Sequence, residues 1–177
     1  LRAAATAAQL GLPLSLETCT EMSLALNNGQ GVLPNPWPRE ARELLISLIG
    51  AGETMVGIFE TLDQEEIIFS WIPEWNSVRS LPQRNVLHRH TVDRHMVETA
   101  VHAAALTRQV HRPDLLLFSA LFHDIGKGNE EDHSERGERL IAPIAARIGF
   151  SEPDIAIIKI LVKHHLLLSA TATRRDL

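Results

Sequence analysis

The chain has 177 residues, of which 45% are hydrophobic and 22% are charged, and its formal net charge is −5. This length and hydrophobic content suffice for one sizeable core, alone or with a helical extension. The longest basic run is the Arg174-Arg175 pair, which argues against a nucleic-acid partner because a phosphate backbone requires clustered Lys and Arg. Uninterrupted apolar runs fall far short of the roughly 20 residues that a membrane-spanning helix needs, so we expect no membrane insertion.

Cysteine usage and the start of the sequence bear on location and completeness. Cys19 is the single cysteine, so the chain can build neither an internal disulfide nor a cysteine-based zinc site. We therefore expect a reducing, cytoplasmic location. The sequence starts at Leu1 with neither a methionine nor a signal-peptide pattern, and we expect it to be a piece of a larger protein.

The first part of the chain is expected to be helical. Ala is abundant, aromatic residues make up only 5% of the chain, and the sequence has no Tyr, a composition that favours helices over sheets. Ser15 is a suitable N-cap, and Gly and Pro residues mark the turns between apolar segments. The predicted helices cover residues 1–9, 15–27, 38–49 and 53–62.

The segment 63–81 differs, because apolar and aromatic side chains crowd around Pro73. We interpret this segment as an irregular junction between the helical lead-in and a second helical region. Helical patterns return after residue 90, separated by Pro and Gly. The predicted helices there cover residues 91–111, 114–126, 134–148 and 153–167. The predicted fold class is all-α.

The placement of histidine points to a metal site. All nine histidines follow residue 87, which leaves nearly half of the chain without any. A divalent cation that activates water requires several nitrogen and carboxylate ligands from different helices, and at least one open coordination position. The candidate ligands are His95, His123, Asp124, His133, His164, His165 and Asp176.

The adjacent pair His123-Asp124 is the centre of this prediction. Neighbouring helical residues point about 100° apart, so both side chains can reach one ion near the end of a helix. We expect that helix to end at Gly126-Lys127-Gly128, which opens a pocket and presents Lys127 to an anion. A ligand set without a thiolate suits Mn, Fe, Zn, Co or Mg, either as one ion or as two ions bridged by Asp124.

The same residues also have ordinary structural interpretations. A lone His-Asp pair is weak support for a metal, because buried histidines are often hydrogen-bonded core residues. Adjacent residues point in different directions, so only one of His164 and His165 is expected to reach the site. Arg174 and Arg175 are either a solvated surface or, beside Asp176, ligands for a phosphate. Four histidines are assigned to the core or the surface: His88, His90, His102 and His111.

A string of eight residues resembles the signature of the HD superfamily of metal-dependent phosphohydrolases. It reads Leu121-Phe122-His123-Asp124-Ile125-Gly126-Lys127-Gly128. Members carry a first His, a His-Asp pair and a distal Asp on a helical bundle, an order that His95, His123-Asp124 and Asp176 match. The resemblance also implies that Lys127 lies near the substrate phosphate.

A closer resemblance covers residues 71–177. It is to the family of bifunctional uridylyltransferase/uridylyl-removing enzymes, which modify the nitrogen-regulatory PII protein. Residues 1–70 resemble the helical linker of that family more loosely. The matching blocks, in order, are Thr91-Val92-Asp93-Arg94-His95, His123-Asp124-Ile125-Gly126-Lys127-Gly128, Asp132-His133-Ser134, His165-Leu166-Leu167-Leu168 and Thr171-Ala172-Thr173-Arg174-Arg175-Asp176.

The resemblance implies a larger architecture, with a nucleotidyltransferase domain before the linker and two glutamine-sensing ACT domains after the HD domain. The Gly-Ser and paired carboxylates of a transferase site are not found in this sequence. We therefore expect an HD-type helical bundle over residues 71–177, preceded by a helical lead-in over residues 1–70.

The activity implied by the resemblance is metal-dependent hydrolysis of a nucleotidyl group, UMP or AMP, from a tyrosine of PII. The implied metal ligands are His95, His123, Asp124, His133, His165 and Asp176. The implied catalytic residues are Asp124, Lys127 and His133, and the implied phosphate ligands are Lys127, Arg174 and Arg175. Two alternatives stay open, a hydrolase of free or cyclic nucleotides and a non-catalytic helical module, although retained ligands speak against the latter.

Overall fold

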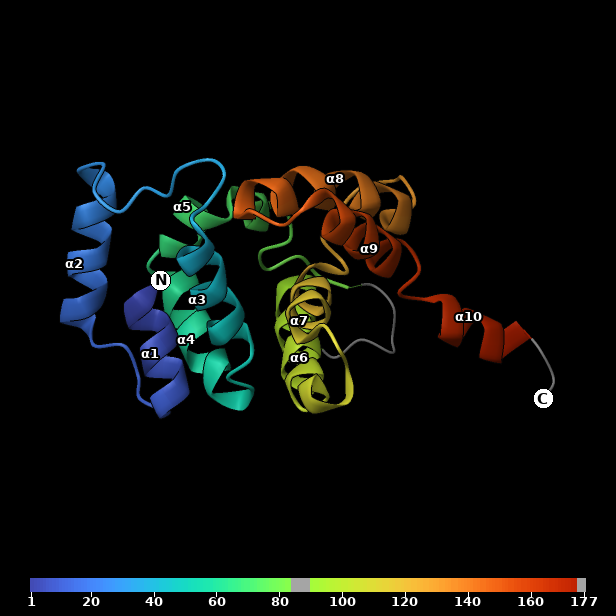
Figure 1. Cartoon of the computed structure of the whole chain (residues 1–177), viewed down its shortest axis with the longest axis horizontal. Coiled ribbons are helices and arrows are strands. Elements are labelled where there is room, and N and C mark those ends of the chain that lie inside the picture. The colour runs from blue at the N-terminus through green and yellow to red at the C-terminus, as the bar shows by residue number, and fades with distance from the viewer. Residues whose placement is uncertain (84–89, 175–177) are drawn as a thin grey trace.

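The computed structural model describes residues 1–83 and 90–174, with the side chain of residue 174 left out. Within these residues every regular element is a helix and none is a strand, so the all-α prediction is confirmed. The helices, labelled in Figure 1, are α1 (Arg2–Leu10), α2 (Leu16–Asn27), α3 (Arg39–Ile49), α4 (Glu53–Gln64), α5 (Ile67–Trp71), α6 (Val92–Ala104), α7 (Pro113–Phe122), α8 (His133–Ile148), α9 (Glu152–Lys163) and α10 (Leu167–Arg174), with the 3-10 helices η1 (Pro73–Ser77) and η2 (Thr107–Gln109).

The helices form two groups along the long axis of the molecule. Helices α1 to α4 stand together at one end, and α6 and α7 lie beside each other in the middle (Figure 1). Helices α8 and α9 pack against each other across one end of the α6–α7 pair, and α10 projects away from the body. The four predicted lead-in helices are confirmed, with Ser15 capping α2 through a hydrogen bond accepted from the Thr18 amide at 3.1 Å.

The junction predicted over residues 63–81 is more regular than expected. It contains α5 and η1, and Pro73 begins η1. Most of its apolar residues are almost fully buried, with Ile68, Ile72 and Trp75 each no more than 1% exposed. The sequence pattern did not reveal α5 because its five residues make little more than one turn, which is too short for amphipathic spacing to repeat.

Three predicted helices after residue 90 end earlier than expected. Helix α6 ends at Ala104, and turns with η2 lead to Pro113, which opens α7. Helix α9 ends at Lys163 instead of residue 167, and a second helix, α10, follows it. The chain is therefore helical up to Arg174, and Asp176 itself lies outside the described residues.

The end of α7 matters most for the site. The helix stops at Phe122 instead of residue 126, so the prediction that the His123-Asp124 pair lies within a helix is wrong. Turn hydrogen bonds take over from there, from the Ile125 amide to the Phe122 carbonyl at 3.1 Å and from the Lys127 amide to the Asp124 carbonyl at 3.0 Å. The tighter turn allows the chain to change direction directly after Asp124.

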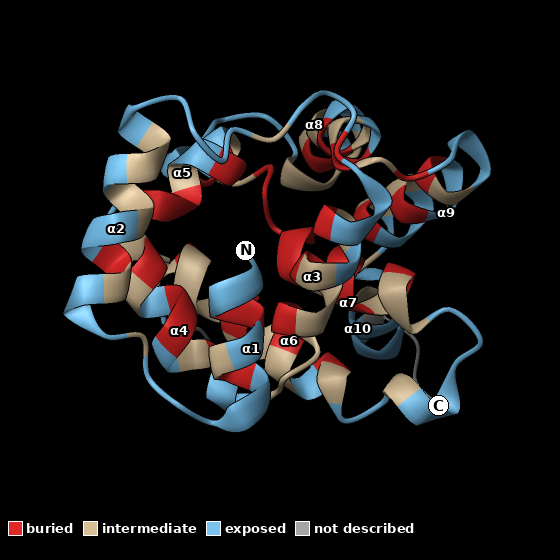
Figure 2. Ribbon diagram, turned by 60° about the vertical axis from the view of Figure 1, so that its left-hand side comes forward, coloured by how far each residue is buried: buried red, intermediate tan, exposed pale blue. Residues whose placement is uncertain are grey.

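The lead-in and the second half share one hydrophobic core. Trp75 lies between them, with its ring edge-on to Phe59 of α4 at 5.0 Å and to Phe122 of α7 at 6.5 Å. The side chain of Arg147 on α8 donates two hydrogen bonds, of 2.7 and 2.6 Å, to the Glu74 carboxylate. Buried residues accordingly line the facing sides of both groups (Figure 2). The domain boundary at residue 70 stays a prediction.

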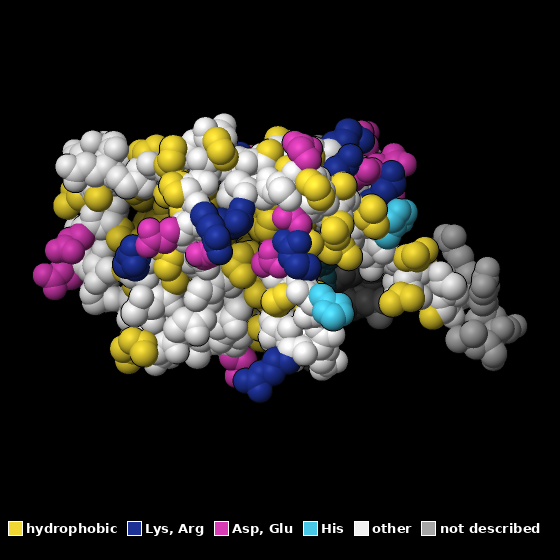
Figure 3. All heavy atoms as spheres, in the orientation of Figure 1, with side chains coloured by type: hydrophobic (Ala, Val, Ile, Leu, Met, Phe, Trp, Pro, Cys, Tyr) yellow, Lys and Arg dark blue, Asp and Glu magenta, His cyan; other side chains and the backbone are white. Residues whose placement is uncertain are grey.

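Exposed apolar side chains gather over α9 and α10 (Figure 3). The stretch Glu152–Thr173 is long and apolar enough to cross a membrane by length and composition alone. Its α9 part, however, buries Ile155, Ile158 and Val162 in the core. Lys163 on the same helix pairs with Glu138 of α8 at 2.6 Å. We therefore interpret the α9 part of this stretch as a helix of the bundle, whereas α10 projects from it.

Gly149, which ends α8, touches the lead-in. Its φ is +89°, and an added Cβ would lie 2.9 Å from the carbonyl oxygen of Trp37. We expect Gly149→Ala to lower the free energy of unfolding by about 3 kcal/mol, because left-handed strain and steric overlap add. Urea unfolding monitored by circular dichroism measures this loss.

Gly29→Ala is the matched control. Gly29 is also left-handed, with a φ of +71°, but nothing lies within 4 Å of an added Cβ. Its expected cost is about 1 kcal/mol, from backbone strain alone. Equal losses in the two variants would contradict a tight contact between residue 149 and the lead-in.

Candidate metal centre

Asp124 lies at the bottom of an open cavity of about 1450 Å³. Its side chain is only 2% exposed. Burial by itself would raise the pKa of this carboxyl, but interactions with His123, His165 and Lys127 outweigh it and hold the pKa well below its usual range. Asp124 is therefore a buried carboxylate that stays ionised.

One oxygen of this carboxylate faces two histidines. Oδ2 lies 3.2 Å from Nε2 of His123, the residue before it, and 3.7 Å from Nε2 of His95 on α6. The two imidazole nitrogens are themselves 3.2 Å apart. These three side chains form the first ligand group.

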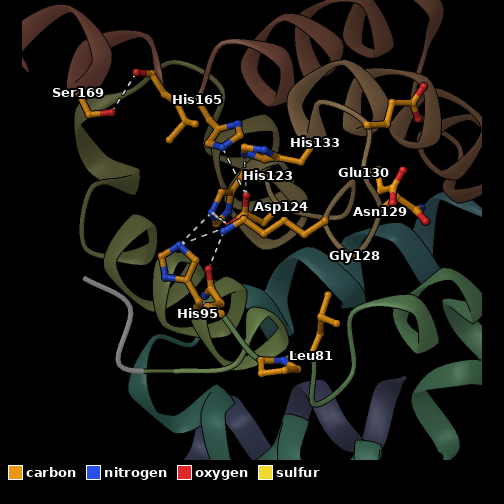
Figure 4. A pocket seen from close by; sticks show the side chains of 15 residues that line it. Leu81, His95, His123, Asp124, Gly128, Asn129, Glu130, His133, His165 and Ser169 are labelled. Atoms are coloured by element: carbon orange, nitrogen blue, oxygen red, sulfur yellow. Dashed lines mark hydrogen bonds and ion pairs between the residues drawn. The ribbon is translucent and has the colours of Figure 1, made fainter. Parts of the chain in front are cut away.

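The other oxygen faces a second pair of histidines. Oδ1 lies 3.4 Å from Nε2 of His165, which follows α9, and 3.7 Å from Nε2 of His133, the first residue of α8. These three side chains form the second ligand group. Figure 4 shows both pairs of rings turned toward Asp124 from opposite sides of the carboxylate.

Two of the rings are oriented by backbone carbonyls. Nδ1 of His123 donates to the carbonyl of Ala120 at 2.8 Å, and Nδ1 of His165 donates to that of Val162 at 2.7 Å. A carbonyl only accepts, so in the neutral ring the lone pair is on Nε2, which faces Asp124. This arrangement is typical of histidines that bind metals.

The pKa values of the two histidines in the second ligand group shift in opposite directions. Burial lowers the pKa of His133, so that ring is neutral near pH 7. Burial also opposes charge on His165, but the contact with Asp124 prevails and raises the pKa of that ring. The contact with Asp124 therefore favours the protonated form of His165 when no metal is bound.

These observations fit a divalent metal. In each group the ligand atoms lie within 4.8 Å of one another. Asp124 Oδ1 and His165 Nε2 are buried and have no hydrogen-bond partner among the described residues, as expected for atoms that a cation would satisfy. With only imidazole and carboxylate donors, the set suits Mn, Fe, Zn, Co or Mg and not metals that require thiolate ligands. The shared Asp124 can bridge two ions.

Glycines let the ligand-bearing segments approach. An added Cβ on Gly126 would overlap the carbonyl oxygen of His133 and lie 2.5 Å from the amide nitrogen of Gly137. The turn that carries Asp124 thus runs directly against the first turns of α8. Asp132 holds that end of α8 by accepting hydrogen bonds from the amides of Ser134 and Glu135 at 2.9 and 3.0 Å.

Lys127 completes the site, together with a residue that the sequence analysis missed. Its Nζ lies 2.7 Å from Asp124 Oδ2 and donates to Oε1 of Gln83 at 2.6 Å. Gln83 lines the cavity from the loop before α6. It stands in no motif, so the sequence offered no signal for it.

The structure brings together most of the predicted site residues. His95, His123, Asp124, Lys127, His133 and His165 converge, whereas His164 is exposed. Arg175 and Asp176 lie outside the described residues, as does the side chain of Arg174. Of the histidines assigned to the core or surface, His90, His102 and His111 are exposed and His88 lies outside the described residues.

Comparison with known proteins places this site in a family context. Residues 92–176 match the HD domain family. The whole chain is 54% identical to a bifunctional uridylyltransferase/uridylyl-removing enzyme of Streptomyces coelicolor and 49% identical to one of Mycobacterium tuberculosis. A third, from Corynebacterium glutamicum, is 33% identical over 99% of the chain. The chain spans 21%, 21% and 25% of these relatives. No solved structure matches it.

The close approach at Gly126 provides a test of the geometry. We expect Gly126→Ala to push α8 away from the turn and, with it, His133 away from Asp124. Mn²⁺ affinity should fall by about tenfold or more, and the free energy of unfolding by about 3 kcal/mol. Calorimetric titration and urea unfolding measure the two effects.

Gly57→Ala is the control for this substitution. Gly57 lies in α4 with open space around an added Cβ, so Ala should stabilise the chain by up to about 1 kcal/mol and leave metal affinity unchanged. If Gly126→Ala bound Mn²⁺ as tightly as the wild-type chain, the close contact between the Asp124 turn and α8 would not determine the metal affinity.

Metal binding should strengthen as the pH rises. The pKa of His165 lies above its ordinary value of 6.5, so protonation of this ring stabilises the metal-free fold at low pH, and that stability is lost as the pH rises through the folded pKa. A metal requires the neutral ring and must displace that proton. Mn²⁺ should therefore raise the melting temperature more at about pH 8 than at about pH 6. Equal increases would contradict this linkage, and His102→Ala should behave as the wild type.

Proposed function

Because the chain belongs to the HD-domain family, we propose that it is a metal-dependent phosphodiesterase that removes a nucleotidyl group, UMP or AMP, from a tyrosine of the PII signalling protein. The observation that carries the proposal is the Asp124 carboxylate, with each oxygen facing its own pair of histidines and with Lys127 beside it. Metal-dependent hydrolysis of a phosphodiester needs this combination of metal ligands and a cationic side chain, here Lys127, that can bind a phosphate oxygen.

The matched domain, and not the names of the relatives, supports the removing reaction over the transferring one. The names contain both activities, and this chain corresponds to about a fifth of the relatives' length. The part it covers includes the HD domain. The transferase and glutamine-sensing ACT domains would belong to the remaining length. PII as the substrate and UMP or AMP as the released group follow from the sequence resemblance.

The residues have separable roles in the proposed reaction. His95, His123, Asp124, His133 and His165 would hold one or two ions, with Asp176 as a further candidate. When bound, a divalent ion supplies a water with a pKa of about 7 and neutralises charge on a phosphoryl oxygen. Lys127 would bind another phosphoryl oxygen and offset the charge that develops there, helped by Arg174 and Arg175.

The leaving group reduces the need for an acid. A tyrosine phenolate has a pKa near 10, so it departs with less help from a proton than an alkoxide does. The lowered pKa of His133 agrees with this, because a neutral imidazole serves as a ligand and not as a proton donor near pH 7. We therefore assign His133 to the metal.

Asp124→Asn tests the proposal directly. The substitution keeps the shape of the side chain but removes the charge that both ligand groups share. We expect loss of Mn²⁺ binding and a fall of at least about 100-fold in nucleotide release from modified PII. Chromatography of the released nucleotide measures the rate and identifies UMP or AMP.

His102→Ala is the matched control, since His102 lies on α6 with His95 but is exposed. It should retain both metal and activity. Release of nucleotide from modified PII with no hydrolysis of free or cyclic nucleotides would support the proposed substrate. Hydrolysis of the free nucleotides alone would reject it, and a chain that neither binds Mn²⁺ nor releases any nucleotide would be a non-catalytic module.

A further inference from the structure

Lys127 and a metal would compete for the same oxygen. Nζ of Lys127 lies 2.7 Å from Asp124 Oδ2, the oxygen that His95 and His123 also face. An ion held by the first ligand group needs that oxygen, and its charge would repel the ammonium at this distance. When the ion binds, Lys127 requires another partner if it is to stay beside the site.

Gln83 already provides that partner. Its Oε1 accepts a hydrogen bond of 2.6 Å from Lys127 Nζ. Its Nε2 donates to the carbonyl of His90 at 3.3 Å. The second bond fixes the amide with its oxygen toward the ammonium, because the opposite orientation would place an NH₂ group against a cation.

The residues just before Gln83 contact two elements that border the cavity, the start of α6 and the turn after Lys127. The Val92 amide donates to the Leu81 carbonyl at 2.9 Å, and the Ser80 amide donates to the Asp93 carboxylate at 2.7 Å. Both bonds join the loop to the start of α6, the helix of His95. On the other side an added Cβ on Gly128 would lie 3.1 Å from Leu81 Cδ2, so the turn after Lys127 packs on the same loop.

We propose that Gln83 is a positioning residue that holds the Lys127 ammonium at the mouth of the metal centre when a divalent ion takes over Asp124. Lys127 then stays available to a phosphate oxygen instead of turning into solvent. The inference rests on the proposed function in one respect: it requires a bound metal and a phosphate ligand. It does not depend on which nucleotide or which protein substrate is involved.

A merely structural role for Gln83 makes a different prediction. If Gln83 acted only by stabilising its loop, removing it would weaken phosphate binding whether or not Lys127 were present. If it acts through Lys127, its removal should have no further effect once the ammonium is gone. A double-mutant cycle separates the two cases.

The cycle uses the Mn²⁺-loaded chain and inorganic phosphate, with affinities measured by calorimetry. Gln83→Leu should weaken phosphate binding about fivefold, the equivalent of one hydrogen bond. Lys127→Met should weaken it about 30-fold. The double variant should bind no more weakly than Lys127→Met. Gln64→Leu, the same change at an exposed position at the end of α4, should leave the affinity unchanged.

Additive losses in the double variant would overturn the inference, as would a wild-type chain that binds no phosphate. Thermal unfolding confirms that each variant folds, and Gln83→Met replaces Gln83→Leu if the latter does not. The two proposals fail separately. Coupled phosphate binding without nucleotide release from PII rejects the proposed function alone, whereas nucleotide release with additive losses rejects the role of Gln83 alone.

Discussion

The constraint on which this structure depends is an ionised carboxylate in a buried position. A buried carboxylate without partners costs roughly several kcal/mol, and Asp124 is only 2% exposed. Four imidazoles and one ammonium surround it, and the interactions with His123, His165 and Lys127 outweigh the effect of burial on its pKa. In the chain without a metal, the ammonium of Lys127 offsets this charge, and the contact with Asp124 raises the pKa of His165. A divalent ion would supply positive charge in place of these side chains. The surroundings of Asp124 therefore favour a cation before any metal binds.

The rest of the fold serves to bring these partners together from separate segments. His95 comes from α6, His133 from the start of α8 and His165 from the turn after α9. Their approach requires the backbone of the Asp124 turn to lie against α8, which only glycine at position 126 permits. The N-cap of α8 fixes the remaining freedom of that helix end. Stability and site geometry therefore rest partly on the same residues.

The lead-in contributes to the site through the core. Trp75 packs against Phe122, the last residue of α7, and against Phe59 of α4. The turn that carries His123 and Asp124 thus begins on a helix end that is fixed by the lead-in. The loop of Gln83 follows Trp75 in the chain and faces the same cavity. The segments on either side of residue 70 act as one packed unit in this chain.

Composition and local spacing were enough to predict the helical class and the lead-in helices, because those depend on propensity and caps. The family was indicated by the resemblance of five sequence blocks to known proteins. The histidine cluster and the His-Asp pair also indicated the candidate ligands by residue type. The helix breaks after Ala104, Phe122 and Lys163 were missed, since they arise from turns whose hydrogen bonds carry no strong local signal. The division of Asp124 between two pairs of histidines, and the contact of Gln83 with Lys127, were decided only by the tertiary structure. Both join residues that lie far apart in the chain, and such contacts depend on how helices pack and not on the order of residues.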